Sequence, residues 1–357
     1  MSRVADKLIK AKTASGAAYD DGSPFDTAIV VGRGGTNVST LDISNPAASP
    51  FPADLDPAGA GSGPLFITYN SAGIDRTNEV VISADGNDRV YATDFSDPTN
   101  VQSTQIYYDS TVLDAPRGGC GVDETRQVAW FISATPNTLV GIDYSDITTN
   151  GGSVAGSIAL SYQCWGLGYD AANQIVYITT AYRMFSYDVS NLSSISSLDS
   201  IFDNGIQGCR ELAIDPVTKV MYGAVQNGGI VALDISDPSN MSVLSRNTSG
   251  AGNFCGKVDP NIEYAFGLGG TGNIYSYDVS DPSSMTLDDT FTDSTIPTTN
   301  SYYRSLAIDT DQKLLYYKGY NTSNYTMVII SYADPTNLVK INSVGAGQPM
   351  KILLFNR

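Results

Sequence analysis

The side chains available for chemistry are restricted at the outset, because the chain of 357 residues contains no histidine. Without imidazole, neither a Ser-His-Asp triad nor a Cys-His nucleophile pair can form, and the commonest metal ligand is missing. Carboxylate, tyrosine, lysine and arginine chemistry remains, in a chain with 37 Asp and Glu and 22 Tyr. The sequence carries no catalytic motif, so we predict that the protein is not an enzyme.

Four cysteines, Cys120, Cys164, Cys209 and Cys255, follow one another at spacings of 44, 45 and 46 residues. Each precedes an aspartate of the repeat described below, but by 3, 6, 6 and 4 residues, so the four do not form one level ring. A disulfide requires Cα atoms within about 7 Å, and structural zinc requires four converging ligands. We therefore predict four buried, reduced thiols.

Two short acidic stretches are similar to calcium loops: Asp85-Gly86-Asn87-Asp88 and Asp309-Thr310-Asp311. Neither has the Asp-x-Asp-x-Asp-Gly run followed by a distant Glu that a calcium-binding loop uses. Hairpin turns of the Asp-Gly kind explain both stretches better. We expect no cofactor; calcium is the one for which the sequence gives any indication.

These side chains are positioned by a repeat whose clearest copy is Leu233-Asp234-Ile235-Ser236-Asp237-Pro238. Its first Asp recurs at spacings of 52, 49, 45, 46 and 44 residues, and a shortened copy, Ser331–Pro335, makes seven. The alternating residues before the motif predict a half-buried strand, which the Ser-Asp-Pro turn ends. We interpret these aspartates as turn residues. The other copies are Leu41–Pro46, Thr93–Pro98, Ile142–Ile147, Tyr187–Leu192 and Tyr277–Pro282.

A second recurring piece lies about twenty residues upstream of the first, as in Leu212-Ala213-Ile214-Asp215. An aliphatic-aromatic segment such as Val220-Met221-Tyr222 follows it after a few residues. Each unit therefore contains four short strands within 44 to 52 residues, which is typical of one propeller blade.

The repeat resembles the LVIVD-type repeat of β-propellers, in which an aliphatic strand runs into Asp-aliphatic-Ser-Asp-Pro. The starts Arg117-Gly118-Gly119 and Arg304-Ser305-Leu306 are similar to the inner-strand start of that family. The resemblance implies a binding or scaffolding module and spans roughly residues 25–357. We predict an all-β fold: one seven-bladed β-propeller of four-stranded antiparallel blades, preceded by an N-terminal arm at residues 1–24. Met350–Phe355, a strand without a unit of its own, is expected to close the ring in the first blade.

Composition limits the partners. The net charge of −17 argues against nucleic acid, because phosphate contacts need clustered Lys and Arg. No apolar run approaches 18 residues, so we expect no membrane span. The first residues lack the apolar core of a secretory signal, and we expect synthesis in the cytoplasm.

The arm is the most basic part of this acidic chain, with Arg3, Lys7, Lys10 and Lys12. It is either a frayed terminus or a segment that docks on an acidic neighbour. The candidate assembly contacts are Val4, Lys7, Leu8, Ile9 and Lys10. The loop at residues 45–64 and the segment 286–302, which is partly a strand, are expected to face outward, where binding loops commonly lie.

Three hypotheses for function remain open. The first is a non-enzymatic structural propeller in a larger assembly, with a virus or phage particle as the favoured setting and copies of itself as possible neighbours. The second is a cellular scaffold, cytoplasmic or surface-attached, that binds protein or glycan. The third is a glycan-active enzyme in the channel, since sialidase-like propellers use Tyr, carboxylates and clustered arginines. The candidate channel-mouth residues are Arg117, Trp165, Arg210 and Arg304.

Overall fold

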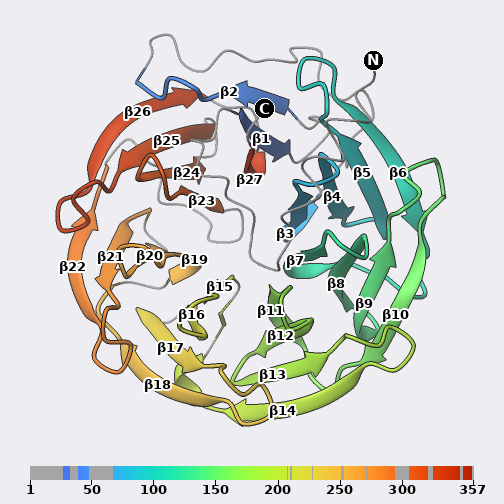
Figure 1. Cartoon of the computed structure of the whole chain (residues 1–357). Coiled ribbons are helices and arrows are strands. Elements are labelled where there is room, and N and C mark those ends of the chain that lie inside the picture. The colour runs from blue at the N-terminus through green and yellow to red at the C-terminus, as the bar shows by residue number, and fades with distance from the viewer. Residues whose placement is uncertain are drawn as a thin grey trace.

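The computed structural model shows seven antiparallel sheets arranged around one central axis (Figure 1). The residues that the structure describes are 27–32, 39–47, 67–206, 208–209, 211–226, 228–250, 253–269, 272–293, 305–320, 325–345 and 349–355. No helix in these ranges is long and apolar enough to cross a membrane. The fold is an all-β seven-bladed propeller, which confirms the sequence prediction.

Six blades have four strands each, numbered from the innermost strand outward. Blade 2 is β3 (Ile67–Asp75), β4 (Val80–Asp85), β5 (Arg89–Asp94) and β6 (Gln102–Tyr108). Blade 3 is β7 (Arg117–Asp123), β8 (Val128–Ala134), β9 (Asn137–Asp143) and β10 (Ser153–Ala159). Blade 4 is β11 (Cys164–Asp170), β12 (Ile175–Thr180), β13 (Arg183–Asp188) and β14 (Ser196–Phe202), followed by a 3-10 turn, η1 (Asn204–Ile206).

The second half of the ring repeats this plan. Blade 5 is β15 (Leu212–Asp215), β16 (Val220–Ala224), β17 (Ile230–Asp234) and β18 (Ser242–Asn247). Blade 6 is β19 (Asn253–Asp259), β20 (Tyr264–Gly269), β21 (Ile274–Asp278) and β22 (Thr286–Phe291). Blade 7 is β23 (Ser305–Asp309), β24 (Leu314–Tyr320), β25 (Tyr325–Ser331) and β26 (Val339–Gly345).

Blade 1 joins the two ends of the chain. Its described strands are β27 (Pro349–Phe355), innermost, then β1 (Thr27–Gly32) and β2 (Ser39–Asp42). Thr27 pairs with Phe355 and Ala28 with Leu354. β27 lies between the inner strands β23 and β3 of the adjacent blades (Figure 1). The C-terminal strand therefore closes the ring, as the sequence predicted, and leaves the inner edge of β1 paired.

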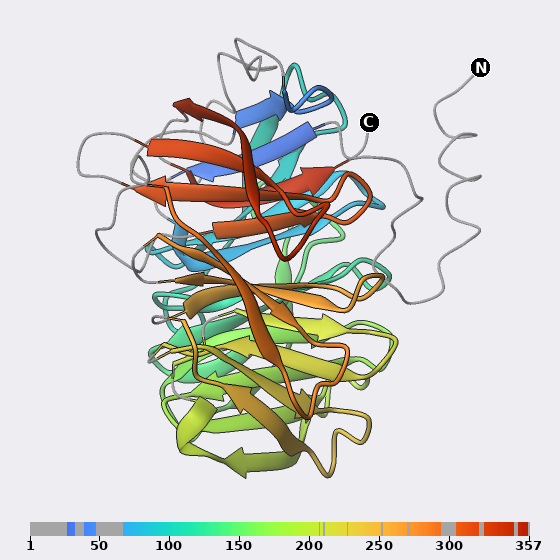
Figure 2. The ribbon, with the colours of Figure 1, turned by 90° about the vertical axis from the view of Figure 1, so that its left-hand side faces the viewer.

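Because successive strands are antiparallel, the turns alternate between the two ends of the ring, which Figure 2 shows from its edge. The turns between the first and second and between the third and fourth strands lie at one end, which we call the acidic end. The turns between the second and third strands, and the connections between blades, lie at the other, which we call the aromatic end. The apolar core fills the spaces between neighbouring blades, with Trp130 and Phe131 fully buried on opposite sides of β8.

Candidate functional site

Each inner strand of blades 2 to 7 ends in an aspartate that is at most 7% exposed. In blade 3, Oδ1 of Asp123 accepts the backbone N–H groups of Thr125 at 3.1 Å and Arg126 at 2.9 Å. These bonds fix the turn into the second strand. The six equivalent aspartates are Asp75, Asp123, Asp170, Asp215, Asp259 and Asp309.

The turn ends four residues after that aspartate, in a non-glycine residue with positive φ, between 54° and 58° in all six blades. In blade 3 this residue is Gln127, whose carbonyl accepts the N–H of Tyr144 at 2.9 Å. The same bond links Phe95 to Glu79 in blade 2 at 3.0 Å. Each turn at the acidic end is thus tied to the end of the third strand of its own blade.

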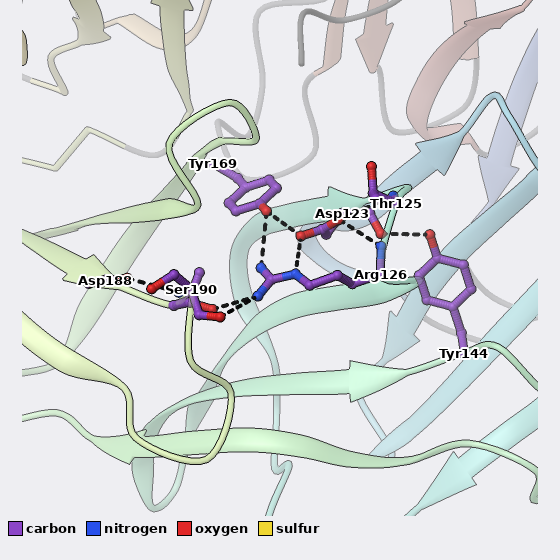
Figure 3. Close-up of polar contacts among 8 residues, drawn as sticks. Asp123, Thr125, Arg126, Tyr144, Tyr169, Asp188 and Ser190 are labelled. Atoms are coloured by element: carbon purple, nitrogen blue, oxygen red, sulfur yellow. Dashed lines mark hydrogen bonds and ion pairs between the residues drawn. The ribbon is translucent and has the colours of Figure 1, made fainter. Parts of the chain in front are cut away.

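At the junction of blades 3 and 4, the aspartate also reaches the neighbouring blade (Figure 3). Oδ2 of Asp123 accepts hydrogen bonds from Arg126 Nε and from the Tyr169 hydroxyl of β11, both at 2.6 Å. Nη1 of Arg126 donates to the carbonyls of Val189, at 2.8 Å, and Ser190, at 3.3 Å, in blade 4. We call Asp123, Arg126 and Tyr169 the blade 3–4 clasp.

Other junctions use related contacts. Oδ2 of Asp75 accepts the Tyr144 hydroxyl of blade 3 at 2.7 Å. Oδ2 of Asp259 accepts Lys313 Nζ at 2.8 Å and the Tyr332 hydroxyl at 3.0 Å, both from blade 7. The aspartates at these junctions therefore fasten one blade to the next as well as shaping a turn.

The clasp brings a tyrosine, a carboxylate and an arginine together, which is the combination that a tyrosine nucleophile would need. Burial, and then the hydrogen bond to Asp123, raise the pKa of Tyr169 well above its usual value. A nucleophilic tyrosine needs the opposite shift, because the phenolate is the reactive form. The chemistry of this group is accordingly that of a hydrogen-bonded fastening between blades.

The repeated Asp-x-Ser-Asp-Pro segments form the turns between the third and fourth strands. In blade 5, Oδ1 of Asp234 accepts the N–H of Ser236 at 2.9 Å, and Oδ1 of Asp237 accepts the N–H of Ser239 at 2.9 Å. The interpretation of these aspartates as turn residues is confirmed. The hydrogen bond from the Ser239 hydroxyl lowers the pKa of Asp237, which is fully exposed, so the carboxylate stays charged well into the acidic range.

The two stretches similar to calcium loops have the hydrogen bonds of hairpin turns. Oδ1 of Asp85 accepts the N–H groups of Asn87 and Arg89, at 2.8 and 3.1 Å. Oδ1 of Asp309 accepts the N–H of Asp311 at 3.0 Å. Among the residues described, no group of three or more acidic or cysteine side chains is arranged to hold a metal ion.

The four channel-mouth candidates are only partly within the described residues. The Arg117 guanidinium lies over the Trp165 ring, 5.7 Å from its centroid. A Cβ at the next residue, Gly118, would lie 2.4 Å from the Trp165 carbonyl oxygen, and its φ of 76° favours glycine as well. Arg210 and Arg304 lie outside the described residues, as do the arm contacts Val4, Lys7, Leu8, Ile9 and Lys10.

Glu211 adds a contact between blades: its Oε1 accepts Lys257 Nζ of β19 at 2.6 Å, which joins blades 5 and 6.

Three of the four cysteines, Cys120, Cys164 and Cys209, are free thiols, as predicted; Cys164 and Cys209 are also buried, whereas Cys120 is only half-buried. Burial raises the pKa of Cys164 and Cys209 to about 12, so both remain protonated and unreactive near neutral pH. The side chain of Cys255 lies outside the described part of the structure.

The aromatic end carries the feature that the sequence did not reveal. Across the described ranges, four aromatic side chains are exposed, and all four lie at this end: Tyr108 (57%), Tyr162 (47%), Tyr182 (43%) and Phe202 (59%). The Arg183 guanidinium lies over two of these rings, 5.5 Å from the centroid of Tyr162 and 5.1 Å from that of Phe202. We call Tyr162, Tyr182, Arg183 and Phe202 the blade 4 patch.

The blade 4 patch is assembled from three separate segments. Tyr162 precedes β11, Tyr182 and Arg183 follow β12, and Phe202 ends β14. Phe185 of β13 stacks beneath Tyr162 at 5.7 Å between centroids. Tyr162 and Tyr182 are 20 positions apart along the chain, and Arg183 and Phe202 are 19 apart, the same spacing as Arg89 and Tyr108, which pair in the same register in blade 2.

Comparison with known proteins supports the fold. The LVIVD repeat matches residues 220–248 and 277–293, in blades 5 and 6. No curated protein matches the chain. A protein of unknown function from Desulfotomaculum acetoxidans is 11% identical, with a TM-score of 0.72 over 93% of this chain and 99% of its own. A hypothetical selenium-binding protein from Sulfolobus tokodaii is 11% identical, with a TM-score of 0.73 over 93% and 94%.

A candidate 6-phosphogluconolactonase from Bacteroides uniformis is similar to the same degree: 12% identity and a TM-score of 0.72, over 93% of this chain and 100% of its own. At these identities the structures share the fold, which hosts many unrelated functions. The matched repeats, the seven sheets and the closing strand together identify the chain as a seven-bladed β-propeller with LVIVD repeats in blades 5 and 6.

Proposed function

We propose that the protein is a non-enzymatic interaction propeller that works as a component of a larger assembly and meets its partner at the aromatic end. The observation that carries this proposal is that the four exposed aromatic side chains, Tyr108, Tyr162, Tyr182 and Phe202, all lie at one end of the ring, three of them in the blade 4 patch. Contiguous exposed apolar side chains of this kind mark interaction surfaces.

The residue types are those that dominate protein interfaces. Tyrosine and arginine are enriched among the residues that contribute most to binding, since a ring buries a large area at a small entropic cost. The blade strands hold these aromatic side chains on a rigid scaffold of sheets, so little conformational entropy is lost on binding.

The reactive side chains support binding rather than catalysis. The buried aspartates and the tyrosine of the blade 3–4 clasp take part in turns and blade contacts, and two thiols have raised pKa values. The similarity to a candidate 6-phosphogluconolactonase, at 12% identity, favours no particular reaction for this chain. A glycan-active site in the channel remains the second alternative, and a cellular protein- or glycan-binding scaffold the first.

A virus or phage particle is the setting that we favour for the assembly. The basic segment at residues 3–12 contrasts with a chain of net charge −17. The acidic end of the ring carries exposed aspartates such as Asp146, Asp237 and Asp281, whose pKa values are lowered by neighbouring hydroxyl groups. The arm of one copy and the acidic end of the next are therefore complementary in charge.

Co-sedimentation tests this proposal. Native material from the producing cells, separated on a density gradient, is expected to contain the wild-type protein in a fraction far larger than a monomer, at a fixed stoichiometry. Recovery of the protein as a monomer alone would refute the role in an assembly.

Removing residues 1–14 is expected to leave a folded propeller that no longer enters that fraction. Exposed ion pairs contribute only about 0–1 kcal/mol each, so burial of Val4, Leu8 and Ile9 must supply most of the attachment, at roughly 1.5–3 kcal/mol for each fully covered side chain. A matched variant, Lys7→Gln with Lys10→Gln, should therefore lose much less incorporation than serine at the three apolar positions. Normal incorporation of the truncated protein would mean that the arm is not needed and that the blades alone make the contact.

A further inference from the structure

Arg183 occupies an unusual position for a surface cation. Its guanidinium lies over the rings of Tyr162 and Phe202, with centroid distances of 5.5 and 5.1 Å. Among the described residues it forms no ion pair, although the chain has nearly twice as many acidic as basic residues. The nearest acidic residue along the chain from Phe202 is Asp203, and Arg246 of β18 pairs with that carboxylate.

The two rings restrict the guanidinium, which pairs with no carboxylate in the described structure. A guanidinium fixed in this way has lost part of its side-chain freedom before any ligand arrives, so a carboxylate that pairs with it pays less ordering entropy. The planar fork matches a carboxylate with two parallel hydrogen bonds.

The rings around Arg183 add an apolar requirement. Tyr162, Tyr182 and Phe202 are all 43–59% exposed, and covering them would remove apolar area from water. A ligand suited to the blade 4 patch therefore carries a carboxylate with apolar groups beside it. We propose that the blade 4 patch binds an acidic peptide segment of a partner protein, with Arg183 pairing with one Asp or Glu and the rings covering its apolar neighbours.

Charge favours a segment with one carboxylate over a highly charged ligand. The chain's net charge of −17 repels polyanions, and the Arg183 guanidinium offsets that repulsion at this patch. The residue set, Tyr, Phe and Arg at one end of a single blade, is also the set enriched at protein contacts, which favours a peptide over a sugar. This inference rests on the proposed interaction function and specifies its ligand.

Selection from a phage-displayed library of random seven-residue peptides tests the inference. Selection on the folded wild-type protein is expected to enrich peptides with one Asp or Glu beside an aliphatic or aromatic residue. A synthetic copy of the best peptide should bind Arg183→Ala about 30-fold more weakly or worse, as for a residue that dominates an interface. Arg183→Lys should recover little of the loss, because lysine lacks the planar fork.

Arg89→Ala is the matched control. Arg89 lies over a single exposed ring, Tyr108, at 5.9 Å, at the same end of the molecule but in blade 2. This variant should bind the peptide as wild type does, and both arginine variants should keep the wild-type melting temperature.

The inference is wrong if selection enriches peptides without an acidic residue, if no peptide is enriched, or if Arg183→Ala binds within about twofold of wild type. Binding of sialyllactose, but not of lactose or of any peptide, would likewise overturn it in favour of an acidic sugar. Each of these results leaves the co-sedimentation experiment unaffected, so failure of this inference and failure of the proposed function can be told apart.

Discussion

Deleting residues 349–357 is expected to abolish cooperative folding of the whole propeller. The deletion removes β27, in which Ile352, Leu353 and Leu354 are 1%, 9% and 3% exposed. At roughly 1.5–3 kcal/mol for each buried aliphatic side chain, the loss reaches about 5–9 kcal/mol, comparable with the entire stability of a typical protein. Circular dichroism during thermal unfolding should show no cooperative transition, and the protein should elute as aggregate.

Aggregation is part of this expectation for a separate reason. Without β27 the inner edge of β1 is unpaired, and blades 7 and 2 lose the strand that lies between them. An open strand edge is a template for pairing with other chains. Deletion of residues 356–357 alone leaves β27 and should behave as wild type. A soluble, cooperatively folding protein without residues 349–357 would mean that closure does not hold the ring together.

Asp123→Asn is expected to destabilise the protein by about 3 kcal/mol at pH 7, near the lower end of the range for removing one partner of a buried ion pair. The lower end applies because the side chain of the partner, Arg126, retains 18% exposure. Replacement removes the negative charge that faces Arg126 Nε and the Tyr169 hydroxyl. Urea denaturation at pH 7, compared with wild type, measures the difference.

The destabilisation caused by Asp123→Asn should become smaller as the pH falls. Burial alone would raise the pKa of Asp123, but hydrogen bonds from Tyr169 and Arg126 outweigh it and hold the pKa below the ordinary value of 3.8. A carboxyl whose pKa is lower in the folded state stabilises the fold above its unfolded pKa, and this contribution disappears as the pH falls through the folded value. The difference in unfolding free energy between wild type and Asp123→Asn should therefore become smaller below pH 3.8.

Asp75→Asn provides the matched control. Burial raises the pKa of Asp75 by more than the hydrogen bonds from Asn78 and Tyr144 lower it, so the fold disfavours the charged form. That cost is greatest at neutral pH and vanishes below the unfolded pKa. An asparagine oxygen can still accept the Tyr144 hydroxyl, so this variant should lose clearly less stability than Asp123→Asn at pH 7. Equal losses would mean that charge at the clasp contributes nothing.

The architecture could be predicted from the sequence because the residues that form each turn lie next to one another along the chain. Asp234 and Asp237 each accept an N–H from the residue two positions on, so their spacing directly records a turn. The recurrence of that turn gives the number of blades. Blade 7 has Ser331 in place of the first aspartate, and its side-chain oxygen accepts the N–H of Ala333 at 3.3 Å, which preserves the turn.

The contacts between blades were not accessible because they join residues far apart in sequence. Tyr169 lies 46 positions from Asp123, and Tyr332 lies 73 positions from Asp259. One feature of the sequence could have pointed to two of the contacts between blades, Tyr144 with Asp75 and Tyr332 with Asp259. After the third strand, blades 4 and 5 have Val189 and Ile235, whereas blades 3 and 7 have tyrosine, whose hydroxyl needs a buried partner.

The candidate surface residues also differ in how far the sequence could predict them. Arg117 and Trp165 were two of the four channel-mouth candidates, and the Arg117 guanidinium lies over the Trp165 ring; their place at the channel mouth stays a prediction. In the blade 4 patch, Arg183 and Phe202 pair across β13 and β14 in the register that Arg89 and Tyr108 have in blade 2, so this part of the patch follows the repeat. Tyr162 and Tyr182 lie in the connection before β11 and in the turn between β12 and β13, and loops on a rigid scaffold are where specific binding is expected.

Hydroxyl-radical footprinting tests most directly whether the aromatic end is the interaction surface. The protein would be labelled once as an isolated monomer and once in the assembly recovered by co-sedimentation, and oxidation would be measured residue by residue. Tyr108, Tyr162, Tyr182 and Phe202 should be strongly protected in the assembly, while Val339, 47% exposed on the outermost strand β26, should react equally in both. Protection of Val217, 79% exposed at the acidic end, with all four aromatic side chains still fully reactive would contradict the proposal.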